Sequence, residues 1–182
     1  MFDFDEQLQV GKQGEELIKL YYESQKTETD KNKFIVRDAR KEEQLKGADF
    51  FIINNELGAR YVEVKTDTRA EETGNVALEI QVVYGDTKTI GCALKTFPDY
   101  LFYWVYPTQD ILYWNPQELN PFIVDWIAEG KRVVEVENKN FFSRTMLIPM
   151  EEMFDTGVVK KIQVSEELIN KVLHEEDATS PF

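Results

Sequence analysis

The chain has 182 residues, 42% of them hydrophobic and 13% aromatic, which excludes a wholly disordered protein and is enough for a buried core. It carries 34 acidic and 21 basic residues, a formal net charge of −13, whereas proteins that hold nucleic-acid phosphates usually present a basic face. The acidic excess is uneven, because residues 1–70 hold 15 acidic and 12 basic side chains and residues 71–182 hold 19 and 9.

The hydropathy of the chain and its few cysteine and histidine residues exclude several other classes of protein. No run of the chain approaches the roughly 18 apolar residues of a membrane span, and the segment 1–5 lacks the basic start and apolar stretch of a signal peptide. The single cysteine, Cys92, excludes an internal disulfide, and with the single histidine, His174, it supplies too few ligands for a structural zinc site. We therefore expect a cytoplasmic protein, in the cytoplasm of a host cell if the chain is encoded by a phage.

Hydrophobic periodicity predicts a helix followed by strands in the first half. The helix covers 11–22, with an apolar stripe made of Leu17, Ile18, Leu20, Tyr21 and Tyr22. Strands are predicted over 34–36, 49–53, 60–65 and 76–83, and the second and third form a hairpin. The segment 66–75 is expected to be a polar loop, and the segment after Gly85 a loop that reaches Phe97.

The second half continues with the aromatic strand 100–106 and the strand 111–114. The aromatic run fits a core strand better than a surface that stacks on bases, which is the alternative. Asn115-Pro116 starts a helix that ends at Gly130. Strands over 132–136 and 145–148 and a short helix from Ser165 follow, and a frayed acidic tail is expected from about 175. We predict one α/β domain over 1–182, with a central mixed sheet flanked by helices.

The hairpin carries the residues that are suited to chemistry. Alternation places Tyr61, Glu63 and Lys65 on one face of their strand. Asp49 begins the preceding strand, so that the hairpin brings its carboxylate toward Glu63. Two converging carboxylates repel each other unless a cation lies between them, and Mg²⁺ prefers such oxygen ligands. A bound divalent ion would activate water and stabilise charge on a phosphoryl oxygen.

These segments resemble the PD-(D/E)XK nuclease superfamily, whose members include restriction-endonuclease-like and Holliday-junction-resolvase-like proteins. Gly11-Lys12-Gln13-Gly14-Glu15 is similar to the first helix of the family, and Gly47-Ala48-Asp49 with Val62-Glu63-Val64-Lys65 is similar to its signature strands. The segments 73–79 and 96–100 resemble parts of small phage or bacterial members. The resemblance covers about 11–106; Ala48 replaces the usual proline, and nothing after Tyr106 matches a motif.

The resemblance implies a restriction-endonuclease-like core and a divalent-metal-dependent nuclease that acts on DNA. Asp49, Glu63 and the backbone carbonyl of Val64 would hold Mg²⁺ or Mn²⁺, and Glu15 would assist, through a water molecule. Lys65 would activate or orient the attacking water. Whether cleavage is endo- or exonucleolytic, whether RNA is a substrate and whether the protein forms a homodimer stay open.

Other residues extend this hypothesis. Glu79 and Gln81 alternate onto one face of their predicted strand and are candidates for an extension of the site, or for a solvated rim. A surface for nucleic acid is expected in the basic stretch 26–46, which is equally well explained as a solvated loop; its candidate residues are Lys33, Arg37, Arg40, Lys41 and Lys46. Helical periodicity does not separate Glu15 from Glu16, and Glu15 is chosen from the resemblance.

Rival hypotheses stay open. The spacing of an acidic residue two positions before a lysine is weak by itself, since Asp86-Lys88, Glu129-Lys131 and Glu137-Lys139 share it. A nuclease fold without turnover, binding DNA or a protein partner, would fit the net charge of −13 better. An acidic protein that mimics DNA to inhibit another enzyme is a further alternative, as is an ordinary half-solvated strand.

Overall fold

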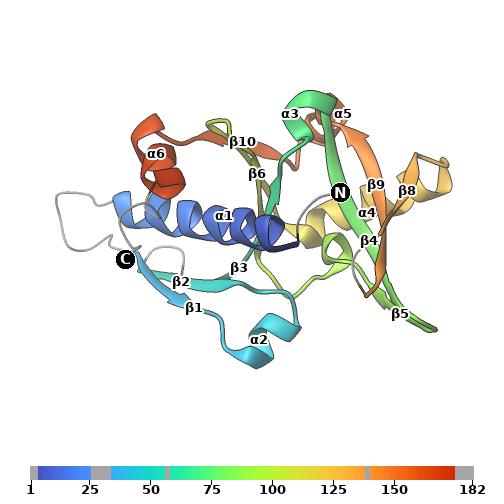
Figure 1. Ribbon diagram of the computed structural model, residues 1–182, viewed down its shortest axis with the longest axis horizontal. Coiled ribbons are helices and arrows are strands. Elements are labelled where there is room, and N and C mark those ends of the chain that lie inside the picture. Colours follow the sequence, from blue (N-terminus) through green and yellow to red (C-terminus); the bar gives the residue numbers. More distant parts are fainter. Residues whose placement is uncertain (1–3, 26–33, 56–57, 138–139, 175–182) are drawn as a thin grey trace.

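Two β-sheets lie next to each other in the computed structural model, which describes residues 4–25, 34–55, 58–137 and 140–174 (Figure 1). The larger sheet has the order β1 (Ile35–Asp38), β2 (Phe50–Asn54), β3 (Gly58–Asp67), β6 (Tyr100–Val105), β7 (Asp110–Trp114) and β10 (Lys160–Gln163). Only its β3–β6 pair is parallel, and the neighbouring pairs are antiparallel. This confirms the predicted α/β class with a central mixed sheet.

The second sheet is antiparallel throughout and was not predicted as a separate layer. Its order is β5 (Thr87–Ile90), β4 (Asn75–Tyr84), β9 (Phe142–Pro149) and β8 (Val133–Glu137). β5 lies in a segment that was predicted to be a loop. Every residue of this strand is exposed, so the strand has no apolar alternation by which the sequence could reveal it.

Helices cover both sheets. α1 (Phe4–Ser24) packs on β3, and α6 (Glu166–His174) packs on α1 (Figure 1). The remaining helical segments are α2 (Lys41–Leu45), α3 (Ala70–Thr73), η2 (Cys92–Leu94), α4 (Pro116–Ala128) and α5 (Met150–Asp155). The predicted cap of α4 is confirmed, because the backbone NH of Gln117 donates to the side chain of Asn115 at 2.9 Å. Each described helix is too short or too polar to cross a lipid bilayer.

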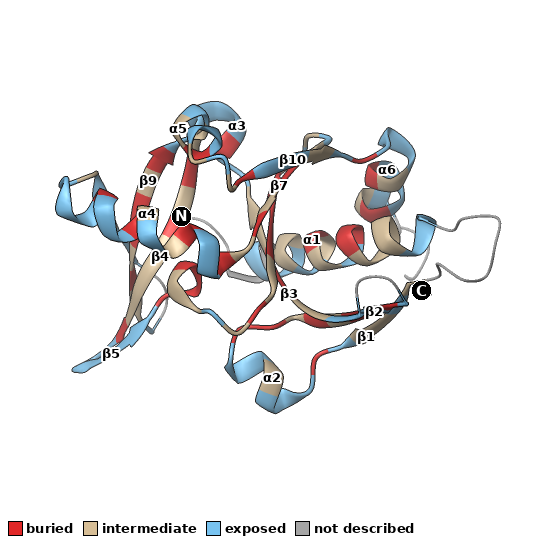
Figure 2. Cartoon of the chain, turned by 180° about the vertical axis from the view of Figure 1, so that it is seen from behind, coloured by how far each residue is buried: buried red, intermediate tan, exposed pale blue. Residues whose placement is uncertain are grey.

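Two apolar clusters lie on opposite faces of the larger sheet, as the buried positions in Figure 2 illustrate. Val62 and Val64 pack with Leu17 and Ile18 of α1 in one cluster. Leu101, Tyr103 and Val105, on the other face of β6, pack with residues of the second sheet. Because side chains alternate along a strand, Glu63, Lys65 and Asp67 face the second sheet and not α1.

Gly14 sets the close approach of α1 to β3. A Cβ atom at this position would overlap the Thr66 hydroxyl and lie 3.5 Å from Val64 Cγ1. A larger residue here would therefore force the Thr66 side chain or the helix to shift. The close approach also fixes the position along β3 of the next helical residue, Glu15.

Some predicted elements differ from the observed ones. α1 begins at Phe4, seven residues before its predicted start, and the predicted polar loop 66–75 instead contains the end of β3 and the short helix α3. The Asp67 carboxylate accepts hydrogen bonds from the backbone NH groups of Arg69 and Ala70, which stabilises this turn. The expected frayed tail from 175 lies outside the described residues.

Candidate active site

The β2–β3 hairpin places Asp49 beside Glu63. The register pairs Phe50 with Val62, so the next pair along the two strands is Asp49 and Glu63. The Asp49 NH donates to the Val62 carbonyl at 2.8 Å, and the Val64 NH donates to Asp49 Oδ2 at 2.7 Å. Asp49 is thus hydrogen-bonded to the backbone of the residues before and after Glu63. Because Asp49 and Glu63 are opposite each other on paired strands, their side chains lie on the same face of the sheet.

Glu63 is a buried carboxyl group, with 5% of the residue exposed. Lys65 Nζ lies 2.6 Å from Glu63 Oε1, and the Lys65 side chain keeps 42% of its surface exposed. Burial raises the pKa of Glu63 from 4.5 to about 7; Lys65 opposes this rise and the Asp49 carboxylate adds to it. Near neutral pH this group therefore both binds and releases a proton.

The pKa of Asp49 is shifted by the same two opposing effects, burial and the nearby Lys65 charge. Burial raises its pKa, while the Lys65 ammonium and the hydrogen bond from Val64 counteract the rise. The two carboxylates disfavour each other's ionisation, so a cation between them would relieve a cost that the folded chain otherwise bears. Burial alone would lower the pKa of Lys65, but the carboxylates of Glu63 and Asp49 raise it overall, so Lys65 remains an ammonium at neutral pH.

Glu15 lies at the margin of this site. Burial raises its pKa, and the Asp49 carboxylate is the next largest cause. Lys19, one turn further along α1, opposes the rise; its ammonium pairs with Asp38 Oδ1 at 2.6 Å. The structure therefore brings Glu15 near Asp49, whereas Glu16 is exposed to solvent.

Lys95 belongs to the site and was not predicted. Its ammonium lowers the pKa of both Asp49 and Glu63. Its side chain lies across Gly47, where an added Cβ would be 2.6 Å from Lys95 Cδ. Gly47 has a φ of 97°, which favours glycine, and this bare backbone leaves room for the lysine. No periodic pattern marks Lys95, because it follows the irregular segment η2.

Glu79 and Gln81 do not share a face, contrary to the predicted alternation. Thr145 and Arg144, adjacent on β9, pair with Glu79 and Gln81, so Ile80 is an extra residue in a β-bulge. Gln81 therefore turns to Arg144, which donates to it at 3.3 Å. Glu79 instead lines a small cavity of about 10 Å³ together with Lys65 and Cys92. Burial raises the pKa of Cys92 to about 12, so this cavity holds a neutral thiol.

An open groove of about 630 Å³ is lined in part by Lys95. We call it the aromatic groove; α2, the β4–β5 hairpin, the segment after η2 and the residue before β9 form its walls, and its lining includes Lys46, Glu79, Tyr84, Lys95, Phe97 and Phe141. Tyr84 and Phe141 have ring centroids 4.9 Å apart, and Lys46 Nζ lies 5.0 Å from the centre of the Phe97 ring. Glu79 and Lys95 connect the groove to the site.

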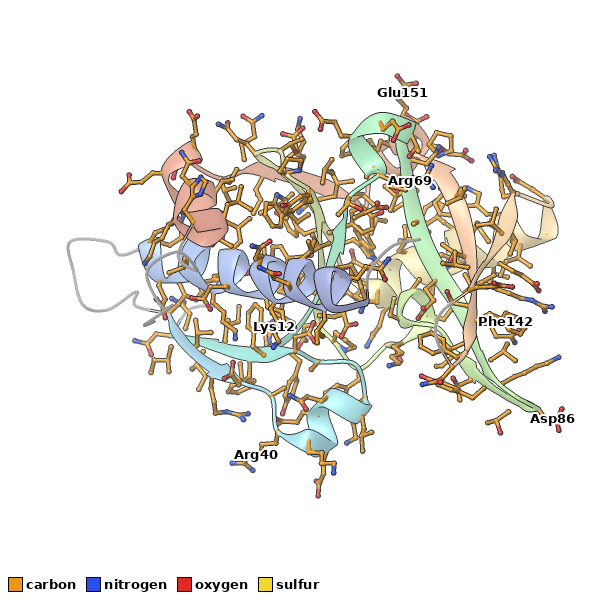
Figure 3. The ribbon with its side chains drawn as sticks, in the orientation of Figure 1. Lys12, Arg40, Arg69, Asp86, Phe142 and Glu151 are labelled. Carbon is orange, nitrogen blue, oxygen red and sulfur yellow. The ribbon has the colours of Figure 1, made fainter. Side chains whose placement is uncertain are left out.

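The basic residues proposed to bind nucleic acid do not form one surface in the structure. Lys46 lines the aromatic groove, whereas Arg40 and Lys41 are exposed around the start of α2, and Arg40 projects from the lower edge of the molecule in Figure 3. Arg37 pairs with Glu43 at 3.1 Å and lies over the Phe51 ring. Lys33 lies outside the described residues.

The residues present are compatible with one divalent cation. Among the described residues, no three acidic, histidine or cysteine side chains gather as a metal cluster. Asp49 and Glu63 would thus be the only direct side-chain ligands. The NH and carbonyl of an extended residue point to the same side of its strand, so the Val64 carbonyl lies on the edge where the Val64 NH binds Asp49. Lys65 Nζ contacts Oε1 of Glu63, so a cation would bind this carboxylate through its other oxygen.

Comparisons with known proteins identify no relative: no family model, curated protein or solved structure matches the chain.

Proposed function

We propose that the chain is a divalent-metal-dependent nuclease that hydrolyses phosphodiester bonds of DNA at Asp49, Glu63 and Lys65. The observation that carries this proposal is the convergence of one buried carboxyl group, one half-buried carboxyl group and the ammonium group of Lys65. A purely structural pair has little reason to retain a second buried carboxylate, because burying an ionised group is costly unless a partner compensates it.

Each residue has a distinct task in this proposal. Asp49, Glu63 and the Val64 carbonyl would hold Mg²⁺ or Mn²⁺, with Glu15 acting through water. When bound, the ion would lower the pKa of a water molecule and neutralise charge on the phosphate. Lys65, whose ammonium lies 2.6 Å from Glu63 Oε1, would hold a phosphate oxygen and orient it for in-line attack.

The direct test is cleavage of single-stranded, duplex and branched DNA with Mg²⁺ or Mn²⁺. We expect Glu63→Gln and Lys65→Ala each to lower the rate by about 100-fold or more, the range typical of groups that stabilise charge in the transition state. Glu129→Gln and Lys131→Ala are matched controls, because this glutamate also precedes its lysine by two residues and lies 4.0 Å from it, at the end of α4. Equal rates in all four variants would remove Glu63 and Lys65 from the mechanism.

A second candidate is a nuclease-like module that binds DNA or a protein without cleaving. The ion pair between Lys65 and Glu63 favours it, because this pair compensates the buried carboxylate without a metal. The net charge of −13 favours it as well. Calorimetric titration with Mn²⁺ separates the candidates: the nuclease must bind the ion, and Asp49→Asn must weaken binding, whereas the inert module gives no heat that depends on Asp49.

A further inference from the structure

The aromatic groove combines ring surfaces with positive charge. Tyr84 is 50% exposed and stands beside Phe141, while Phe97 packs on Tyr61 with 4.6 Å between ring centroids. Lys46 and Lys95 add two ammonium groups against the single carboxylate of Glu79. This positive balance contrasts with the net charge of −13 for the whole chain.

This combination fits a polyanion whose bases are free. Every base has a π-face that can stack on an aromatic ring, and lysines beside such rings neutralise the backbone phosphates of a single strand. In a duplex the bases are stacked on each other and cannot reach rings set between α2 and the β4–β5 hairpin. The groove volume of 630 Å³ lies within the roughly 300–1,000 Å³ of sites that take small ligands, so it can hold one or two nucleotide units.

Lys95 links this groove to the carboxylates. It lines the groove, lies across Gly47, two residues before Asp49, and its charge acts on Asp49 and Glu63. A strand with bases against Tyr84 and Phe97 would therefore pass a phosphate along Lys95 toward Lys65. Glu79, which lines both the groove and the small cavity at Lys65, marks the same route.

We propose that the aromatic groove binds unpaired nucleotides, so that the strand presented to Asp49, Glu63 and Lys65 is single-stranded. This inference rests on the proposed nuclease function and specifies its substrate. Lys95 is a positioning residue that holds a phosphate between the rings and the carboxylates. Figure 3 labels Arg40 on the α2 side of the groove and Asp86 at the tip of the β4–β5 hairpin on the other side.

The test measures binding without cleavage, by fluorescence anisotropy of a labelled oligothymidylate of about ten nucleotides in EDTA. We expect Tyr84→Ala and Lys95→Ala each to weaken binding by about tenfold, and the same sequence as a duplex to bind more weakly. Phe154→Ala and Lys160→Ala are matched controls in α5 and β10, away from the groove, and should bind like the unaltered protein. Because Tyr84 is half exposed, its variant should retain the circular dichroism of the unaltered fold.

The inference would be overturned if the protein bound duplex and single strand with equal affinity, or if the groove variants bound like the controls. It would also be overturned if the unaltered protein sedimented as a dimer and Tyr84→Ala as a monomer. The last result would assign the groove to a second copy of the chain. Cleavage is scored separately. Groove-dependent binding without cleavage under Mg²⁺ or Mn²⁺ would refute the nuclease function alone, whereas cleavage of duplex DNA that is indifferent to Tyr84 and Lys95 would refute the groove alone.

Discussion

Glu63 combines burial with an ionisable group, and this combination makes stability depend on pH. A carboxyl group whose pKa rises from 4.5 to about 7 on folding binds its proton more tightly in the folded state than in the unfolded state. The folded protein therefore loses stability as pH increases through this window, and the loss is complete above about 7. The pKa change corresponds to at most about 3 kcal/mol.

We accordingly expect the unfolding free energy of the metal-free protein to fall more steeply between pH 4.5 and 8 than that of Glu63→Gln. Urea unfolding at a series of pH values measures this difference, with the exposed Glu16→Gln as control. Parallel curves for the unaltered protein and Glu63→Gln would show that Glu63 ionises as easily in the folded state as in the unfolded state. Saturating Mn²⁺ should reduce the difference, because a cation favours the ionised carboxylate.

At the scale of elements, the contact between α1 and β3 determines where Glu15 lies. A Cβ at position 14 would overlap the Thr66 side chain, whereas a Cβ at Gly11, one turn earlier in the same helix, meets nothing within 4 Å. The two glycines therefore form a matched pair. Gly14 allows α1 to pack closely on β3, whereas Gly11 only lowers the intrinsic helix propensity of α1.

We expect Gly14→Ala to destabilise the fold by about 1–3 kcal/mol, the usual cost of overpacking. Gly11→Ala should stabilise it by about 0.5–1 kcal/mol, because alanine favours a helix. Urea denaturation measures both. Thr66→Ala should rescue Gly14→Ala, since it removes the overlapping hydroxyl, which is buried without a hydrogen-bond partner in the described structure. Equal stability of Gly11→Ala and Gly14→Ala would contradict the close approach.

At the scale of the whole molecule, net charge limits how the protein can bind a polyanion. A chain of charge −13 repels nucleic acid over most of its surface, so that binding must rely on a few local cations and on ring contacts. This situation differs from that of a basic DNA-binding domain, in which many phosphates are neutralised at once.

The salt dependence of oligonucleotide binding tests whether only a few local cations neutralise phosphates. If Lys46 and Lys95 neutralise about two phosphates, the logarithm of the affinity should fall against the logarithm of salt concentration with a slope near −1.4. Lys95→Ala should bring the slope to about −0.7, and Lys160→Ala should leave it unchanged. A slope several times steeper would indicate a broad basic surface elsewhere.

The local part of the architecture was predictable. Alternation in 61–65 distinguished Glu63 and Lys65 from Val62 and Val64, and the hairpin placed Asp49 opposite Glu63. The start of α4 followed from Asn115 and Pro116. Such features depend on neighbours within a few residues, because strand alternation, helix capping and short turns are local effects. The assignment of the site to a nuclease family remains a prediction.

Only the tertiary structure decided which distant segments meet. The parallel pairing of β3 with β6, the second sheet, the bulge that separates Glu79 from Gln81, and the approach of Lys95 to Gly47 have no local pattern. The sequence by itself determined the residue types and their faces on a strand, because these follow from backbone geometry. Which residues face each other across the aromatic groove depended on how whole elements pack. This packing minimises the exposed apolar surface of the entire chain and not that of any one segment.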